Sequence, residues 1–239
     1  MTSTEFWQTD LLRTLAGQAE RVELKLVVPR HDGSSLGIDP DRRPDRRVYF
    51  LDTPDLAFFR HGVIVRFRDR SRRHDDAVVK LRPVVPGRVP GWLRQADSFQ
   101  MEVDALPGNA VCSGALKKRL GRDDVSRILA AGRPLTKLLS ARQRKLLARY
   151  APPWVGLADL TVFGPADVRC QSVKLRGLDR GLTAEHWRYP DGSDLLELST
   201  RCPVDKAATA AERVTAALRA YGIGPAAEQP TKTEMALSA

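Results

Sequence analysis

Charged and apolar residues alternate along four short segments in the first half of the chain, and this alternation limits the folds open to it. Successive side chains of a β-strand point to opposite faces, so residues two apart share a face. The alternation therefore predicts strands that each have one apolar face and one charged face. The charged positions are Arg21, Glu23 and Lys25, then Arg66 and Arg68, then Lys80 and Arg82, and finally Glu102 and Asp104.

Three of the four charged faces repeat like charges, which is unusual for a half-exposed strand, and the first face mixes signs at Glu23 and Lys25. If the sheet closes into a barrel with these faces inward, its lumen holds cations beside a cluster of carboxylates. Arginine and lysine bind phosphate oxygens, and carboxylates can hold Mg²⁺ or Mn²⁺. Any single charged pair is most simply a solvated sheet face, but several such strands in succession favour an enclosed site.

The rest of the chain predicts a single α+β domain, residues 1–239, that is mainly antiparallel β. Further strands are expected at residues 48–51, 143–150, 154–162, 168–175, 182–189 and 195–199, with a last strand near 231–237. Helices are expected within residues 1–18, in a helical insertion at 113–140, and at 206–222, where Gly222 supplies a C-cap. Residues 31–47 are polar and indicate a loop, and Asp52, Thr53 and Pro54 indicate a turn and helix cap.

The balance of charge restricts the partners. Lysine and arginine number 39 against 29 aspartates and glutamates, which favours nucleic acid, a membrane surface or phosphorylated small molecules. Nucleic acid is disfavoured because aromatic residues make up only 6% of the chain and no helix-turn-helix or zinc-finger pattern is present. Apolar runs fall far short of the ~18 residues of a membrane span. The first residues are too polar for a signal peptide, and the three cysteines are too scattered for a disulfide scaffold. A cytoplasmic protein is therefore expected.

Several of these segments, taken in order, resemble the CYTH domain, or triphosphate tunnel metalloenzyme, superfamily. Residues 47–54, RVYFLDTP, look like the family's YFDTP segment with one extra residue before the aspartate, and residues 63–68, VIVRFR, are similar to its LRxR strand. Residues 80–82, KLR, match its KxR strand, and residues 21–25, RVELK, lie where the family carries ExExK. Residues 195–199 resemble a carboxylate-bearing strand and residues 230–233 the terminal basic strand. The resemblance covers residues 21–237.

The resemblance implies an eight-stranded antiparallel tunnel with helices packed outside, which binds a triphosphate-bearing small molecule with Mg²⁺ or Mn²⁺. Members hydrolyse inorganic or thiamine triphosphate, cyclise ATP, remove the RNA 5′ γ-phosphate or extend polyphosphate. Carried over, the phosphate contacts would be Lys25, Arg66, Arg68, Lys80, Arg82, Arg144 and Lys232. The metal candidates would be Glu23, Glu102, Asp104, Glu185 and Glu197, and the catalytic candidates Glu23, Lys25 and Glu197.

Two positions depart from the family pattern. Arg21 stands where the first glutamate of ExExK is expected, and Ser199 stands where the late strand would carry a second carboxylate. A cation in place of a ligand both removes an oxygen donor and repels a metal. The hypotheses are therefore a metal-dependent triphosphate hydrolase, a polyphosphate or nucleotide binder with a degenerate metal site, and an activity like that of the family's adenylyl cyclases or polyphosphate polymerases.

Overall fold

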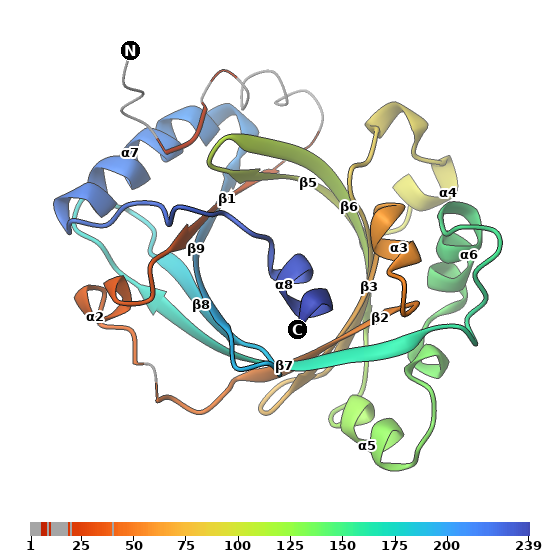
Figure 1. The fold of residues 1–239 in the computed structure, drawn as a ribbon. Coiled ribbons are helices and arrows are strands. Elements are labelled where there is room, and N and C mark those ends of the chain that lie inside the picture. The colour runs from red at the N-terminus through yellow and green to blue at the C-terminus, as the bar shows by residue number, and fades with distance from the viewer. Residues whose placement is uncertain (1–5, 9, 11–18, 20, 40) are drawn as a thin grey trace.

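The computed structural model describes residues 6–8, 10, 19, 21–39 and 41–239, and most of the helix expected within residues 1–18 lies outside them. In this part of the chain nine strands close into a barrel in the order β1-β5-β6-β4-β3-β2-β7-β8-β9 (Figure 1). Neighbouring strands are antiparallel except β1 and β5, which are parallel. The strands are β1 (Arg21–Val28), β2 (Arg46–Asp52), β3 (Val63–Arg70), β4 (Asp76–Leu81), β5 (Phe99–Leu106), β6 (Asn109–Arg119), β7 (Thr161–Val173), β8 (Leu182–Arg188) and β9 (Asp194–Pro203).

The closed barrel is confirmed, but the expected number of eight strands is wrong. The expected helical insertion at 113–140 begins instead as the second half of β6, which hydrogen-bonds to β5 on one side and β4 on the other. Without this strand β4 and β5 would each expose an unpaired edge, so closing the sheet requires it. Helical structure within 113–140 is limited to α5 (Asp124–Ala130) and a 3₁₀ turn at Leu135–Leu138.

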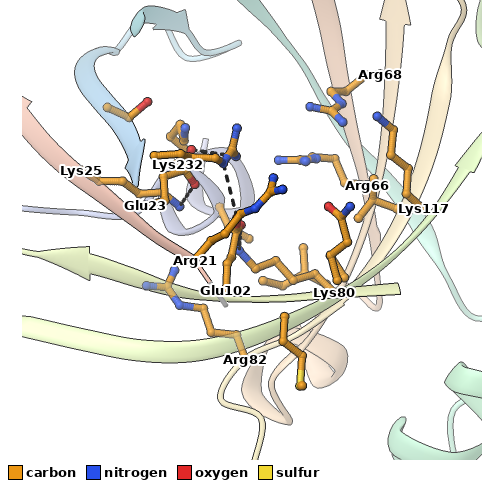
Figure 2. Close-up of a pocket in the computed structure, with 18 of the residues that line it drawn as sticks. Arg21, Glu23, Lys25, Arg66, Arg68, Lys80, Arg82, Glu102, Lys117 and Lys232 are labelled. Carbon is orange, nitrogen blue, oxygen red and sulfur yellow. Dashed lines mark hydrogen bonds and ion pairs between the residues drawn. The ribbon is translucent and has the colours of Figure 1, made fainter. Parts of the chain in front are cut away.

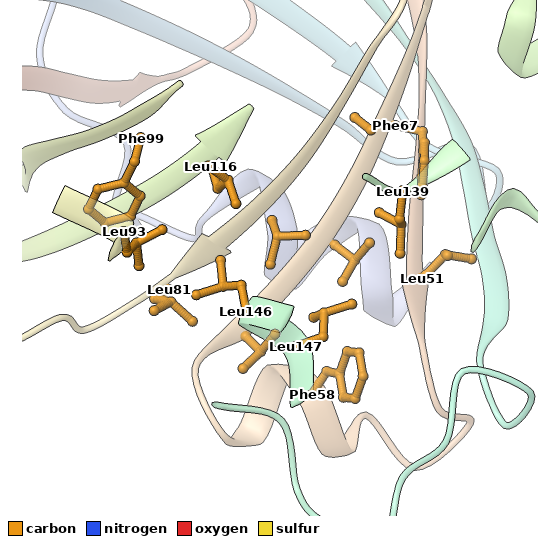
Figure 3. Close-up of a cluster of buried hydrophobic side chains, with 14 of the residues drawn as sticks. Leu51, Phe58, Phe67, Leu81, Leu93, Phe99, Leu116, Leu139, Leu146 and Leu147 are labelled. Carbon is orange, nitrogen blue, oxygen red and sulfur yellow. The ribbon is translucent and has the colours of Figure 1, made fainter. Parts of the chain in front are cut away.

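Four helices cover the outer face of β2, β3, β4 and β6: α3 (Ala57–Arg60), α4 (Gly91–Arg94), α5 and α6 (Ala141–Tyr150). Figure 3 shows the apolar cluster between them, in which Leu146 and Leu147 of α6 lie beside Leu81 and Phe58. Burying such side chains supplies the main driving force for folding.

The strand expected at 143–150 is wrong, because these residues form most of α6. Ser140 and Gln143 make a reciprocal capping box that satisfies the free N–H groups of the first helical turn. The buried amide of Gln143 also donates to the carbonyls of Ala77 on β4 and Leu116 on β6. These contacts fix a helix on the outside of the barrel. The strand expected at 154–162 is likewise confined to its last two residues, where β7 starts.

On the opposite side of the barrel, α7 (Ala207–Ala220) packs Ala211, Val214 and Leu218 against the outer face of β1 and β9. This confirms the helix expected at 206–222. The short helix α2 (Asp32–Ser35) lies in the loop between β1 and β2. Among the described residues, no helix is long and apolar enough to cross a membrane.

The last strand expected near 231–237 is also wrong, because residues Lys232–Ser238 form α8, which lies inside the barrel (Figure 1). Thr231 and Glu234 make its capping box. Ala236 and Leu237 of α8 pack in an apolar cluster with lumen-facing side chains, among them Phe50 of β2 and Trp187 of β8. The helix therefore fills one part of the lumen with an apolar core and leaves the polar part as a cavity.

The turn and helix cap expected at Asp52, Thr53 and Pro54 are confirmed. The buried carboxylate of Asp52 accepts hydrogen bonds from the backbone N–H groups of Thr53, Phe58 and Phe59. The hydroxyl of Thr53 accepts one from Ala57 N–H. Asp52 thus caps α3 and has a structural role.

Candidate functional site

The polar part of the lumen is a cavity of about 1220 Å³. Of the described residues that line it, thirteen are lysine or arginine and five are aspartate or glutamate. Strand periodicity explains this concentration of charge, because every second residue of a barrel strand faces inward. Two further carboxylates, Asp76 and Asp104, lie buried behind the lining side chains. A large share of the chain's positive charge therefore surrounds one cavity.

One wall of the cavity carries three carboxylates and three cations that alternate in a closed ring. Lys25 bridges Glu23 (2.9 Å) and Asp104 (2.5 Å). Lys80 bridges Asp104 (2.7 Å) and Glu102 (3.8 Å). Arg201 bridges Glu102 (3.4 Å) and Glu23 (2.8 Å), which completes what is called here the ion-pair ring.

Strand register brings these side chains together. In the parallel pair of β1 and β5, Glu23 lies opposite Asp104, and in the antiparallel pair of β1 and β9 it lies opposite Arg201. Arg82, which follows β4, places its Nε 3.8 Å from Asp104. Four cations therefore surround the three carboxylates.

The ring keeps its carboxylates ionised. Burial alone would raise the pKa of Asp104, but Lys25, Lys80 and Arg82 outweigh it and hold that pKa well below its usual value. The pKa of Glu23 is lowered in the same way, against burial, by Lys25 and Arg201. The pKa of Lys25 is raised despite its burial, because Asp104 and Glu23 favour its charged form.

The facing wall has an excess of cations. Asp76 pairs with Arg68 (2.7 Å) and Arg70 (2.7 Å) and lies 3.9 Å from Lys117. No ion pair involves Arg66 among the described residues, and its buried Nε has no hydrogen-bond partner. Burial and the neighbouring Arg68 lower the pKa of Arg66 to about 9, so it remains charged at neutral pH. Figure 2 shows Arg66, Arg68 and Lys117 facing Glu23, Lys25 and Lys232 across the cavity.

Lys232, the first residue of α8, forms the floor of the cavity. Its ammonium group lies 2.8 Å from Glu185 and 2.7 Å from Glu197, which are opposite each other on β8 and β9. Glu185 also pairs with Arg46. Burial opposes the charged form of Lys232, but the two glutamates outweigh it and raise its pKa.

Most of the site residues expected from the sequence lie in or just behind the cavity lining, but Arg144 does not. It lies on α6, outside the barrel, where its guanidinium is 3.4 Å from the carbonyl of Thr136. The five expected metal candidates fall into two groups, with Glu23, Glu102 and Asp104 in the ion-pair ring and Glu185 and Glu197 around Lys232.

Six lining cations were missed in the sequence: Arg46, Arg70, Arg94, Lys117, Arg119 and Arg201. Arg46 lies in the segment 31–47 that was expected to be a loop, whereas it begins β2, and Arg70 ends β3. Arg70 continues the alternation of Arg66 and Arg68, and Arg201 continues that of Glu197 and Ser199, so extending each alternation by one step would have found both. Lys117 was hidden in the segment expected to be helical.

The ring carboxylates offer a donor set for a metal ion. One oxygen each of Glu23, Glu102 and Asp104 lie within 4.8 Å of one another, and carboxylate oxygens suit Mg²⁺ and Mn²⁺. The donor types therefore fit a divalent ion. Each of the three carboxylates is also paired with protein cations, so an ion could bind only by replacing some of these pairs.

No family model matches the chain, and no curated protein matches its sequence. Solved structures match its fold. One is a "putative adenylate cyclase" from Bacillus halodurans, 14% identical, with a TM-score of 0.59 over 91% of this chain and 97% of that one. Another is a "putative adenylyl cyclase" from Hippeastrum described as having a dominant triphosphatase activity, 13% identical, with a TM-score of 0.59 over 92% of this chain and 95% of that one. The chain therefore shares the fold of these two proteins, a closed and mainly antiparallel barrel of the kind that the resemblance to the CYTH superfamily predicts.

Proposed function

We propose that the cavity binds the triphosphate group of a small molecule. The observation that carries this proposal is Arg66, a partly buried guanidinium that faces the cavity, has a fully buried and unpaired Nε, and forms no ion pair with any described carboxylate. An uncompensated buried charge is costly, and a bound anion would remove that cost. Arginine suits this ligand because its planar donors match phosphate oxygens in pairs.

A ligand with several phosphates fits the site better than a single phosphate ion. Cations face the cavity from the wall of Arg66 and Arg68, from the opposite wall and from Lys232 on the floor. A chain of three phosphates can contact all of these surfaces at once, whereas one phosphate would leave most of the cations unpaired. Inorganic triphosphate is the simplest such ligand, and a nucleotide or thiamine triphosphate adds only a group at one end.

We further propose that the site hydrolyses this ligand. In phosphoryl transfer, positioned cations stabilise the charge on the oxygens of the transferred group. Arg66, Arg68 and Lys25 would orient the terminal phosphates, and Glu23 or Glu197 would hold the attacking water. Mg²⁺ or Mn²⁺ at Glu23, Glu102 and Asp104 would supply further neutralisation of phosphate charge. The triphosphatase activity described for the Hippeastrum protein supports this reaction class.

A second candidate is binding without turnover, and the ion-pair ring favours it. All three ring carboxylates are paired with lysine or arginine, and Arg21 adds a cation to the same lining. A site of this kind can retain its anion affinity when its metal affinity is low. The two candidates agree on the ligand and differ on the reaction.

Calorimetry with inorganic triphosphate in the presence of EDTA tests the binding. We expect saturable binding that Arg66→Gln weakens and Arg144→Gln leaves unchanged. Equal affinity of wild type and Arg66→Gln for triphosphate would count against the proposed site. Complete displacement of triphosphate by an excess of DNA duplex would also count against it.

Phosphate release from triphosphate, ATP and thiamine triphosphate, each with Mg²⁺ or Mn²⁺, then separates the two candidates. Release that depends on the metal supports hydrolysis. Tight binding with no release from any of the three supports a binding protein, and cyclic AMP or a longer polyphosphate among the products would identify a cyclase or a polymerase.

A further inference from the structure

Arg201 differs from the other cations of the ion-pair ring in its exposure. The side chains of Lys25 and Lys80 are 11% and 18% exposed, and both bind Asp104, which is fully buried. The side chain of Arg201 is 58% exposed and, among the residues that the structure describes, pairs only with the two glutamates of the ring. Arg201 is therefore the ring cation that can leave with the least disturbance of the barrel.

The departure of Arg201 would free donors that suit a metal. Its Nη2 lies 2.8 Å from one oxygen of Glu23 and its Nε 3.4 Å from one oxygen of Glu102. With Arg201 in place, a divalent ion would share these oxygens with a guanidinium and meet its positive charge at close range. Two cations a few ångströms apart repel strongly at the effective dielectric of a protein surface.

Strand pairing holds Arg201 in this position. Its Cα lies opposite that of Glu23 in the antiparallel pair of β1 and β9, at the end of the barrel where β9 approaches its last residues. The neighbouring lumen-facing residues on β9 are Ser199, which carries no charge, and Glu197, which pairs with Lys232. The sheet itself therefore aims the guanidinium at the ring, and neither neighbouring lumen-facing residue of β9 offers it a free carboxylate.

We propose that Arg201 is an internal competitor of divalent metal ions at Glu23 and Glu102. With its guanidinium in the ring, the carboxylates are neutralised and their affinity for a free divalent ion is low. When the guanidinium is withdrawn, the same carboxylates become a metal site. This role concerns the ring alone and does not depend on triphosphate binding.

Titration of the full-length protein with Mn²⁺, followed by the electron paramagnetic resonance signal of the free ion and without any phosphate compound, tests this role. We expect Arg201→Gln to bind Mn²⁺ about tenfold or more tightly than wild type, because a repelling charge is lost next to the ligands. Arg213→Gln is the matched control, since Arg213 is 59% exposed and pairs with Asp179 at 3.0 Å on the outside of the barrel. It should bind Mn²⁺ as wild type does.

Two further variants make the test decisive. The double variant Arg201→Gln/Glu102→Gln should return Mn²⁺ affinity to the wild-type level, because it removes a ligand that Arg201→Gln exposes. Arg201→Thr, which keeps a β-branched residue suited to a strand, gives the same test if Arg201→Gln folds poorly. Mn²⁺ affinity that does not rise in either single variant, or that stays high in the double variant, would overturn the proposal.

Discussion

The ammonium group of Lys25 on β1 lies 2.5 Å from the carboxylate of Asp104 on β5, and the Asp104 side chain is fully buried. The two strands are the one parallel pair of the described barrel, and their register places Asp104 beside Glu23. Since Asp104 also pairs with Lys80, its carboxylate is the centre on which the buried part of the ion-pair ring depends.

Replacing Asp104 with asparagine is expected to destabilise the protein by roughly 3 kcal/mol at pH 7, because two buried lysines lose their shared partner. The pKa of Asp104 is held well below its usual value of 3.8. A lowered carboxyl pKa adds stability that is complete above the unfolded value and is lost as the pH falls through the folded one. The difference between wild type and Asp104→Asn should therefore be constant from pH 7 to 5 and shrink below about pH 4.

Urea unfolding at pH 7, 5, 4 and 3 measures this difference. Asp179→Asn, at an exposed carboxyl that pairs with Arg213 at 3.0 Å, is the control and should cost much less at every pH. A gap between wild type and Asp104→Asn that is unchanged at pH 3 would show that the loss comes from packing and not from charge.

Arg66→Gln should separate binding from stability. Removing a partly buried charge whose Nε lacks a hydrogen-bond partner is expected to raise the stability of the ligand-free protein by about 1 to 2 kcal/mol. The same change should weaken triphosphate binding about tenfold to a hundredfold, since hydrogen bonds to charged groups contribute on the order of 1.5 to 3 kcal/mol. Thermal unfolding with and without triphosphate measures both effects, and Arg144→Gln is the control. A variant that is less stable than wild type and binds equally well contradicts the assignment of Arg66 to the ligand.

Asp52→Ala should lower stability without changing triphosphate affinity. Its carboxylate accepts three backbone hydrogen bonds at the start of α3, and loss of such a cap costs about 1 to 2 kcal/mol. Chemical unfolding and calorimetry with triphosphate measure the two quantities, and Asp52→Asn, which keeps one accepting oxygen, should fall between. Loss of affinity in a folded Asp52→Ala protein would show that this motif takes part in the site.

The sequence predicted the barrel because strand periodicity is a local property. Arg66 and Arg68, or Lys80 and Arg82, are two apart and so must share a face wherever the strand lies. Three of the residues that escaped prediction lie near strand ends, where side-chain patterns fade: Arg46 begins β2, Arg70 ends β3, and Arg201 lies beyond the residues whose alternation is clear. Element boundaries are the least predictable feature of a sequence.

Two of the segments assigned to the wrong kind of element depend on distant partners. Residues 143–150 form a helix that docks on β4 and β6 through Gln143, and residues 232–238 form a helix because the lumen offers Phe50 and Trp187 as an apolar surface. Neither surface is visible in the local pattern, so tertiary packing decided both. The roles of Arg144 and Lys232 differ for this reason, since one helix is outside the barrel and the other inside.

Lys232→Met is expected to destabilise the protein by roughly 3 kcal/mol at pH 7 and to weaken triphosphate binding. The change leaves Glu185 and Glu197 facing each other across β8 and β9 without the ammonium group that bridges them. Glu185 keeps its pair with Arg46, whereas Glu197 becomes an uncompensated buried charge, which has a cost of this order. Like charges at this range raise the pKa of one carboxyl above its unfolded value, so the variant should regain stability as the pH falls from 7 towards 5. The stability of the variant should thus rise with acid, whereas acid unfolds wild type. Urea unfolding of both proteins between pH 7 and 5 measures this difference.

Adding Glu197→Gln to Lys232→Met should recover part of the lost stability at pH 7, because it removes one of the two facing charges. Lys174→Met, at an exposed lysine that follows β7, is the control and should behave as wild type. If the double variant is no more stable than Lys232→Met, the loss arises from the packing of α8 in the lumen, and the ammonium group is not what holds the two glutamates together. Recovery in the double variant without recovery of triphosphate affinity would show that Lys232 has both roles, as the partner of the glutamates and as a contact for the ligand.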